Sequence, residues 1–103
     1  MRNFTTAEQT AELKKRSPFC RDYKLPLSDQ PVIAYSIGEL IRELPRVIKD
    51  SGFTYCLQIE AWDIDVWRVC YTDDTCALYD YYAEELIDAL YSMVVKLTEE
   101  GRI

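Results

Sequence analysis

The chain of 103 residues contains no histidine and only three glycines. Histidine is the commonest general base near neutral pH, so catalytic triads that depend on it are excluded. Gly38, Gly52 and Gly101 are the only glycines, and they cannot form a glycine-rich phosphate-binding loop. We therefore predict no catalytic residue and no cofactor site, and we expect a protein that is not an enzyme.

Four cysteines are present, and their spacing differs from that of a metal site. They are Cys20, Cys56, Cys70 and Cys76. No two of them form a CxxC pair, and no histidine is available to complete a zinc site or to activate a thiol nucleophile. We predict no metal site and interpret all four as small buried hydrophobic residues.

Long apolar runs are also missing. No run approaches the roughly 18 residues that a membrane-spanning helix needs, and the opening MRNFTTAEQT lacks the apolar centre of a signal peptide. We expect a cytoplasmic chain that folds as one domain over residues 1–103.

Charge is spread unevenly along the chain. Residues 1–52 carry nine Lys/Arg and seven Asp/Glu, whereas residues 53–103 carry three and eleven, so the halves have net charges of +2 and −8. A net charge of −6 repels phosphate backbones, which disfavours direct nucleic-acid binding.

Three helices are predicted from caps and apolar spacing. A capping box at Thr5 and Glu8 begins a helix over 6–16, and a second box at Ser36 and Glu39 begins a helix over 37–50. That second helix is expected to kink at Pro45 and to end at Gly52, because proline removes a helical hydrogen bond. A third helix over 82–100, with Asp80 as its N-cap, carries the most continuous apolar stripe and stops at Gly101.

Residues 17–35 form a long proline-rich loop between the first two helices. It contains three prolines, which interrupt regular structure. The path of this loop is left open.

Strands are predicted where apolar and polar residues alternate, over 53–60, 66–72 and 75–80. One face of the first run holds Phe53, Tyr55, Leu57 and Ile59. One face of the second run holds Trp67, Val69 and Tyr71. Placing both sets on the core leaves two registers, one with Cys56 opposite Cys70 and one with Glu60 opposite Arg68. Which face of the third strand is buried is left open.

These elements predict an α+β domain with two layers: a three-stranded antiparallel sheet, with the helices mainly on one face. Asp63 and Asp65 fall in the first hairpin loop of that sheet, and Asp73 and Asp74 fall in the second turn, at the opposite end of the shared strand. The two acidic pairs are therefore separated, which disfavours a shared metal site.

Trp62 is the most informative residue outside the expected core. It falls in the first hairpin loop, where it acts as a contact residue or folds back over the sheet edge, and the sequence does not choose between these. We take Trp62, Asp63, Asp65 and Arg68 as the candidate interaction surface.

The segments YSIGELIRELP, ELIDALYSMVVKLTEEGRI and NFTTAEQTAELKK resemble a family of short, uncharacterised proteins from phages and mobile elements of gut anaerobes. The resemblance covers about half of the chain and rests on helix caps and apolar stripes. It implies a mobile-element origin and a small globular fold, and it supplies no catalytic residue.

The leading hypothesis is an accessory protein that binds another protein. A sharper version is an acidic inhibitor that imitates nucleic acid and occupies a host defence or DNA-handling protein. The alternative is a small-ligand-binding domain that uses the aromatic and acidic end of the sheet. The sequence is compatible with a homodimer and does not require one.

Overall fold

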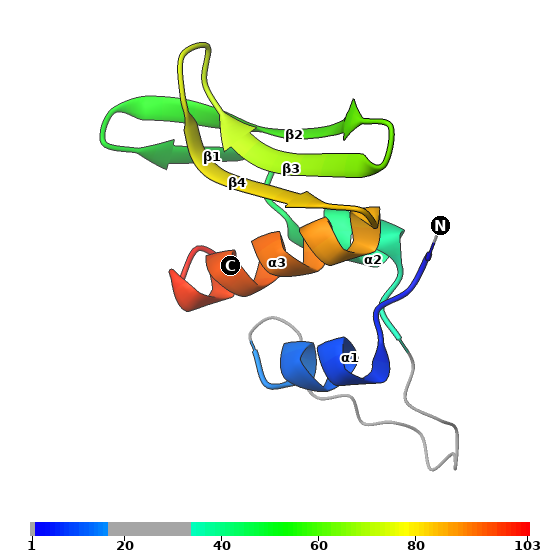
Figure 1. The fold of residues 1–103 in the computed structure, drawn as a ribbon. Helices are drawn as coiled ribbons and strands as arrows, with labels where there is room; N and C mark the ends of the chain where they lie inside the picture. Colours follow the sequence, from blue (N-terminus) through cyan, green and yellow to red (C-terminus); the bar gives the residue numbers. More distant parts are fainter. Residues whose placement is uncertain (1, 17–33) are drawn as a thin grey trace.

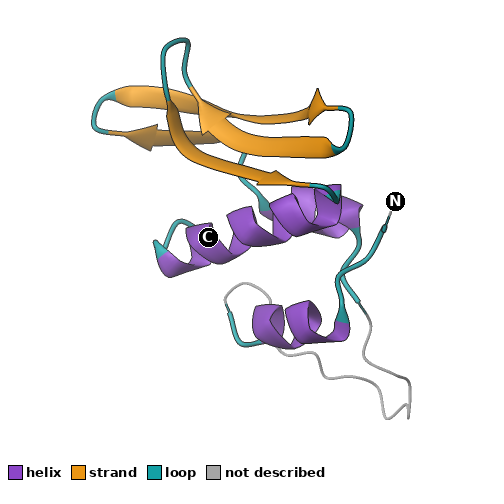
Figure 2. Ribbon diagram, viewed as in Figure 1, coloured by secondary structure: helices purple, strands orange, loops and turns teal. Residues whose placement is uncertain are grey.

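The computed structural model describes residues 2–16 and 34–103. It is an α+β domain, as predicted, but its curled antiparallel sheet has four strands in the order β1-β2-β3-β4 instead of three. The elements are α1 (Ala7–Lys14), α2 (Ile37–Glu43), β1 (Val47–Asp50), β2 (Phe53–Asp63), β3 (Val66–Thr72), β4 (Ala77–Ala83) and α3 (Leu86–Glu99). Figures 1 and 2 show the sheet on one side, with α2 and α3 against one of its faces.

Helix α1 lies beyond α3, away from the sheet (Figure 1), so the helices form more than the single layer that was predicted. Gln9 of α1 donates a hydrogen bond to Asp88 of α3 at 2.7 Å, and Arg16 donates to Thr98 at 3.3 Å. Most of the predicted loop over 17–35 falls on residues 17–33, which lie outside the described part of the chain.

The capping box of α1 is one residue later than predicted. Thr6 accepts a hydrogen bond from the backbone N–H of Gln9, whose side chain accepts one from the N–H of Thr6. Thr5 is instead buried, and its hydroxyl accepts a bond from the backbone N–H of Tyr35 at 3.0 Å. Two adjacent threonines allow either cap, and the contact with Tyr35 decides between them. The predicted box of Ser36 and Glu39 at α2 is confirmed.

The predicted helix over 37–50 is wrong in its second half. Helix α2 ends at Glu43, Leu44 is extended with ψ of 127°, and β1 begins two residues after Pro45, at Val47. A residue that precedes proline is disfavoured in the helical conformation, and Val47 and Ile48 are β-branched. Ile48 is only 5% exposed and pairs with Tyr55 of β2, so burial in the sheet replaces the expected helical turn.

Gly52 has a positive φ, but it serves a hairpin and not a helix end. Ser51 (φ 51°) and Gly52 (φ 84°) form a two-residue turn between Asp50 and Phe53, which pair with each other. Positive φ at both central positions is the signature of the tight turns that match the twist of two paired strands.

The register of β2 and β3 is the one with Glu60 opposite Arg68. Cys56 lies opposite Thr72, so the register that pairs Cys56 with Cys70 does not occur. Strand β2 also continues to Asp63, past the predicted end at residue 60.

The third predicted strand and the last helix both begin later than expected. The strand predicted over 75–80 is β4, Ala77–Ala83, and the helix predicted from residue 82 begins at Leu86. Asp80 is not an N-cap, because it lies in β4 opposite Cys70. Tyr79 and Tyr81 pack against the core, which resolves the open question of the buried face. Aromatic residues favour strands, and Tyr82 and Ala83 continue the pairing with β3.

The core lies between α3 and the sheet. The predicted stripe of α3 is confirmed, and Gly101 ends the helix with φ of 69°. Residues of α3 that are at most 1% exposed are Ile87, Ala89, Leu90, Met93, Val94 and Leu97. Val69 and Tyr71 of β3 are fully buried against this helix layer, and Tyr71 donates a hydrogen bond to the Pro45 carbonyl at 2.6 Å. Within residues 2–16 and 34–103, no helix is long and apolar enough to cross a bilayer.

Asp73 organises the turn between β3 and β4. Its Oδ1 atom accepts hydrogen bonds from the backbone N–H of Cys76 and of Thr75, both at 2.7 Å. These two bonds lower the pKa of Asp73 below its ordinary value of 3.8.

Replacing Asp73 with asparagine is expected to destabilise the protein at neutral pH and to matter less in acid. A carboxylate whose pKa is depressed by folding stabilises the fold above its unfolded pKa, and this stabilisation is lost as the pH falls through the folded pKa. The difference in unfolding free energy between wild type and D73N should therefore shrink below pH 3.8, measured by urea unfolding over a pH series. Asp74→Asn, in the same turn, is the matched control. A difference between wild type and D73N that is constant with pH would contradict this role for the Asp73 charge.

Candidate interaction surface at the hairpin end

The four residues of the predicted surface lie at one end of the sheet, around the β2–β3 hairpin. Trp62 and Asp63 end β2, Asp65 lies in the turn, and Arg68 is the third residue of β3. The turn between β3 and β4, which holds Asp73 and Asp74, is at the other end of β3.

Arg68 is held by two carboxylates from the flanking strands. Its Nη1 atom donates to Glu60 of β2 at 2.9 Å, and its Nε and Nη2 atoms donate to Asp80 of β4 at 2.8 and 3.3 Å. Its side chain is only 17% exposed. The bonds to Asp80 and Glu60 raise the pKa of Arg68, so the guanidinium stays charged. Arg68 therefore organises the surface from within and is not available as a free cation for a partner.

Trp62 lies over this arginine on the outer face of the sheet. The register shifts between Ala61 and Asp63, so Trp62 is the extra residue of a β-bulge. The Arg68 guanidinium carbon is 5.0 Å from the centre of the Trp62 ring, within the range of a cation–π contact. The sequence left open whether Trp62 contacts a partner or folds back over the sheet. The side chain does fold back over Arg68, and it remains 55% exposed.

Tyr82 completes the aromatic pair, and sequence reasoning missed it. Its ring packs edge-to-face against Trp62, with centres 5.5 Å apart, and it lies 5.8 Å from the Arg68 guanidinium carbon. The Tyr82 hydroxyl donates to Asp80 at 3.0 Å, and the side chain is 47% exposed. The sequence placed Tyr82 in a helix, so its position opposite Arg68 in β4 could not be seen.

Asp63, Ile64 and Asp65 form the exposed tip of the hairpin. Asp63 accepts a hydrogen bond from the backbone N–H of Ile64 at 2.7 Å, which holds the turn. Ile64 is 95% exposed, the largest exposure among the large hydrophobic residues of the described chain.

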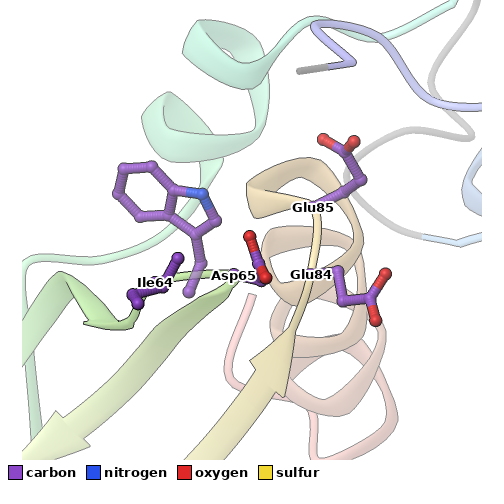
Figure 3. Close-up of a pocket in the computed structure, with 5 residues that line it drawn as sticks. Ile64, Asp65, Glu84 and Glu85 are labelled. Carbon is purple, nitrogen blue, oxygen red and sulfur yellow. The ribbon is translucent and has the colours of Figure 1, made fainter.

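A cavity of about 370 Å³ opens beside this tip. It is lined by Ile64, Asp65, Trp67, Glu84 and Glu85. Figure 3 shows Asp65 between Ile64 and the two glutamates, which come from the segment that joins β4 to α3. Glu85 also accepts a hydrogen bond from the backbone N–H of Arg2 at 2.9 Å. With three carboxylates and an indole in its lining, the cavity suits a positively charged group.

The cysteines are less uniformly buried than predicted. Cys70 is fully buried, and burial raises the pKa of its thiol. It lies on the outer face between Gln58 and Asp80, beside Arg68 along the strand, so this network covers it. Cys56 is exposed on β2, where it pairs with Val47 at the start of the short strand β1. Cys76 is exposed in the turn between β3 and β4. Cys20 is outside the described residues. The described residues contain no group of three or more potential metal ligands.

The arrangement thus joins two exposed aromatic rings to an internally neutralised arginine and an acidic rim. No protein-family model, no curated protein and no solved structure matches this chain, so the interpretation of this surface rests on its own geometry.

Proposed function

We propose that this protein acts by binding another protein through the surface formed by Trp62, Tyr82 and the acidic groups around them. The observation that carries the proposal is the pair of exposed aromatic rings packed against each other over Arg68. Tryptophan and tyrosine are enriched among the residues that dominate binding energies in protein interfaces. These two are already ordered, so little side-chain freedom remains to be lost on binding.

The charge around the rings indicates the kind of partner. Asp63 and Asp65 are exposed beside Trp62, and Glu84 and Glu85 line the adjoining cavity. A partner with lysine or arginine side chains around an apolar patch complements this surface. A protein that normally binds nucleic acid has such a surface, which supports an acidic inhibitor of a host defence or DNA-handling protein. An origin in a phage or mobile element is part of the same proposal.

The test compares aromatic variants on immobilised protein exposed to source-cell lysate. Wild type should retain a stoichiometric partner that moderate salt releases, because exposed charge pairs are screened. Trp62→Ala should weaken binding of that partner about tenfold to a hundredfold, as truncation of a central aromatic residue does. Tyr82→Ala should weaken binding in the same direction.

Phe53→Ala is the matched control, because Phe53 is an aromatic residue of the same strand, 57% exposed, at the other end of β2. A partner that wild type and all three variants retain equally would exclude this surface. Retention that does not change with salt would exclude the acidic mimic and leave aromatic docking in place.

The cavity of about 370 Å³ favours a second candidate, a domain that binds a small cationic ligand. Native mass spectrometry of the purified protein would then show a retained small mass that is lost on denaturation. Glu84→Gln should release that mass, since Glu84 lines the cavity, whereas Trp62→Ala should not. The two variants therefore separate the two candidate functions.

A further inference from the structure

Strand β2 is much longer than the strand that covers its outer edge. It runs from Phe53 to Asp63, but β1 pairs only with its first four residues, and one further bond joins the Leu57 N–H to the Arg46 carbonyl at 2.9 Å. Figure 1 shows β2 continuing past β1. Within the described part of the chain, no strand pairs with this edge beyond Leu57.

The free edge offers backbone donors and acceptors. In an antiparallel pair, every second residue turns both its N–H and its C=O toward the same neighbour. Since Leu57 bonds toward the β1 side, the same alternation turns Ile59 and Ala61 toward that side. No described strand accepts or donates hydrogen bonds at the backbone N–H and C=O groups that these two residues turn to this edge. An exposed strand edge of this kind is a template for another strand.

A cavity of about 520 Å³ lies where β1 begins. It is lined by Ile41, Arg42, Leu44, Arg46 and Leu57. Both arginines are exposed, and neither makes a side-chain hydrogen bond or ion pair with any described residue. Two unpaired cations beside an apolar wall fit an occupant that carries carboxylates next to an apolar side chain.

The tip of the β2–β3 hairpin has those properties. Asp63 and Asp65 are exposed carboxylates, and Ile64 between them is 95% exposed. The tip follows directly on the free edge of β2. The same strand therefore carries the unpaired backbone groups and the acidic end that complements the two arginines.

We infer that β2 pairs antiparallel with β2 of a second copy of this chain. In such a pair, the residues that follow Ala61 in one copy lie beside the residues that precede Ile59 in the other. The acidic tip of each copy then reaches the arginine-lined cavity of its partner, and the contact is made twice across the two-fold axis. A continuous sheet results, with both Trp62 surfaces on the same outer face. The dimer thereby presents two copies of the Trp62–Tyr82 pair on one face. Asp63 and Asp65 are then paired with arginines of the second copy, so Glu84 and Glu85 supply the acidic groups left for another protein. The inference does not depend on the proposed function.

The inference is tested by charge reversal, with mass measured by sedimentation velocity up to about 1 mM protein. Wild type should form a species of twice the chain mass of 12.1 kDa. R42D/R46D and D63R/D65R should each sediment as monomers, because each variant brings like charges together at both contacts. An equimolar mixture should restore the dimer, since both contacts are then complementary. The variant with all four substitutions, which keeps the wild-type net charge, should dimerise alone.

Two further variants separate the ladder from the charges. Ala61→Pro removes a backbone donor that faces outward, so it should abolish the dimer while the circular dichroism spectrum stays native. Lys49→Asp reverses a charge on β1 and should leave the dimer intact. A wild type that remains at 12.1 kDa over the whole series overturns the inference, as does a dimer that survives R42D/R46D.

Discussion

Replacing Leu90 with alanine is expected to lower the free energy of unfolding by about 2–5 kcal/mol. Leu90 is a fully buried residue of α3 and belongs to the hydrophobic core that this helix shares with the sheet. Alanine is the best helix former, so the helix itself is not weakened, and the loss comes from the cavity that is left. A domain of this size has a total stability of about 5–15 kcal/mol, so this single change removes a large fraction of it.

Urea unfolding followed by far-ultraviolet circular dichroism measures this loss. The thermal midpoint should fall by about 10 °C or more. Phe53→Ala removes a larger apolar side chain from a site that is 57% exposed, and it should cost less than about 1 kcal/mol. Equal losses for the two variants would contradict the burial of Leu90 in the core.

The parts of the fold that sequence could predict are those with one strong periodic pattern. The alternation of β2 and β3 and the stripe of α3 have no competing interpretation, and all three elements are present in the structure. The segment around Pro45 has two possible interpretations, a helix and a strand. Ile48 continues the helical stripe of α2, but it also fits a strand, and only its pairing with Tyr55 decides the matter. That pairing depends on the fold of the whole sheet.

The location of the candidate surface was predicted correctly, but the interactions between its side chains were not. Trp62 and Arg68 are at the predicted end of the sheet, but the partners of Arg68 come from two other strands. Glu60 appeared in one of the two registers that the sequence allowed. From the sequence, Asp80 and Tyr82 were assigned to the start of a helix. An aspartate shortly before apolar residues at helical spacing resembles an N-cap. Their role depends on where β4 ends, which local sequence specifies poorly.

Replacing Arg68 with alanine is the second change for which we expect a large effect. Removing one partner of a fully buried ion pair costs about 3–5 kcal/mol, and the partial exposure of Glu60 and Asp80 reduces this to about 1–3 kcal/mol. The two carboxylates would then face each other across an empty position, and the Trp62 ring would lose the guanidinium beneath it. Urea unfolding measures the loss, and the emission of Trp62 should shift toward that of a tryptophan in water.

Stability alone does not distinguish this network from an ordinary surface ion pair, so a local measurement is needed. Cys70 is covered by the same network, and its alkylation, followed by mass spectrometry, should become faster in R68A. Arg102→Ala is the matched control, because Arg102 also bonds to two groups, Tyr79 and Asp50, at 2.8 and 3.2 Å. It should destabilise the protein without changing the alkylation of Cys70 or the emission of Trp62.

Arg68→Lys keeps the charge but cannot bond to both carboxylates in the same geometry, so it should give an intermediate rate of Cys70 alkylation. Equal alkylation of Cys70 in R68A and R102A would mean that general loosening of the sheet, and not the network over the outer face, exposes the thiol.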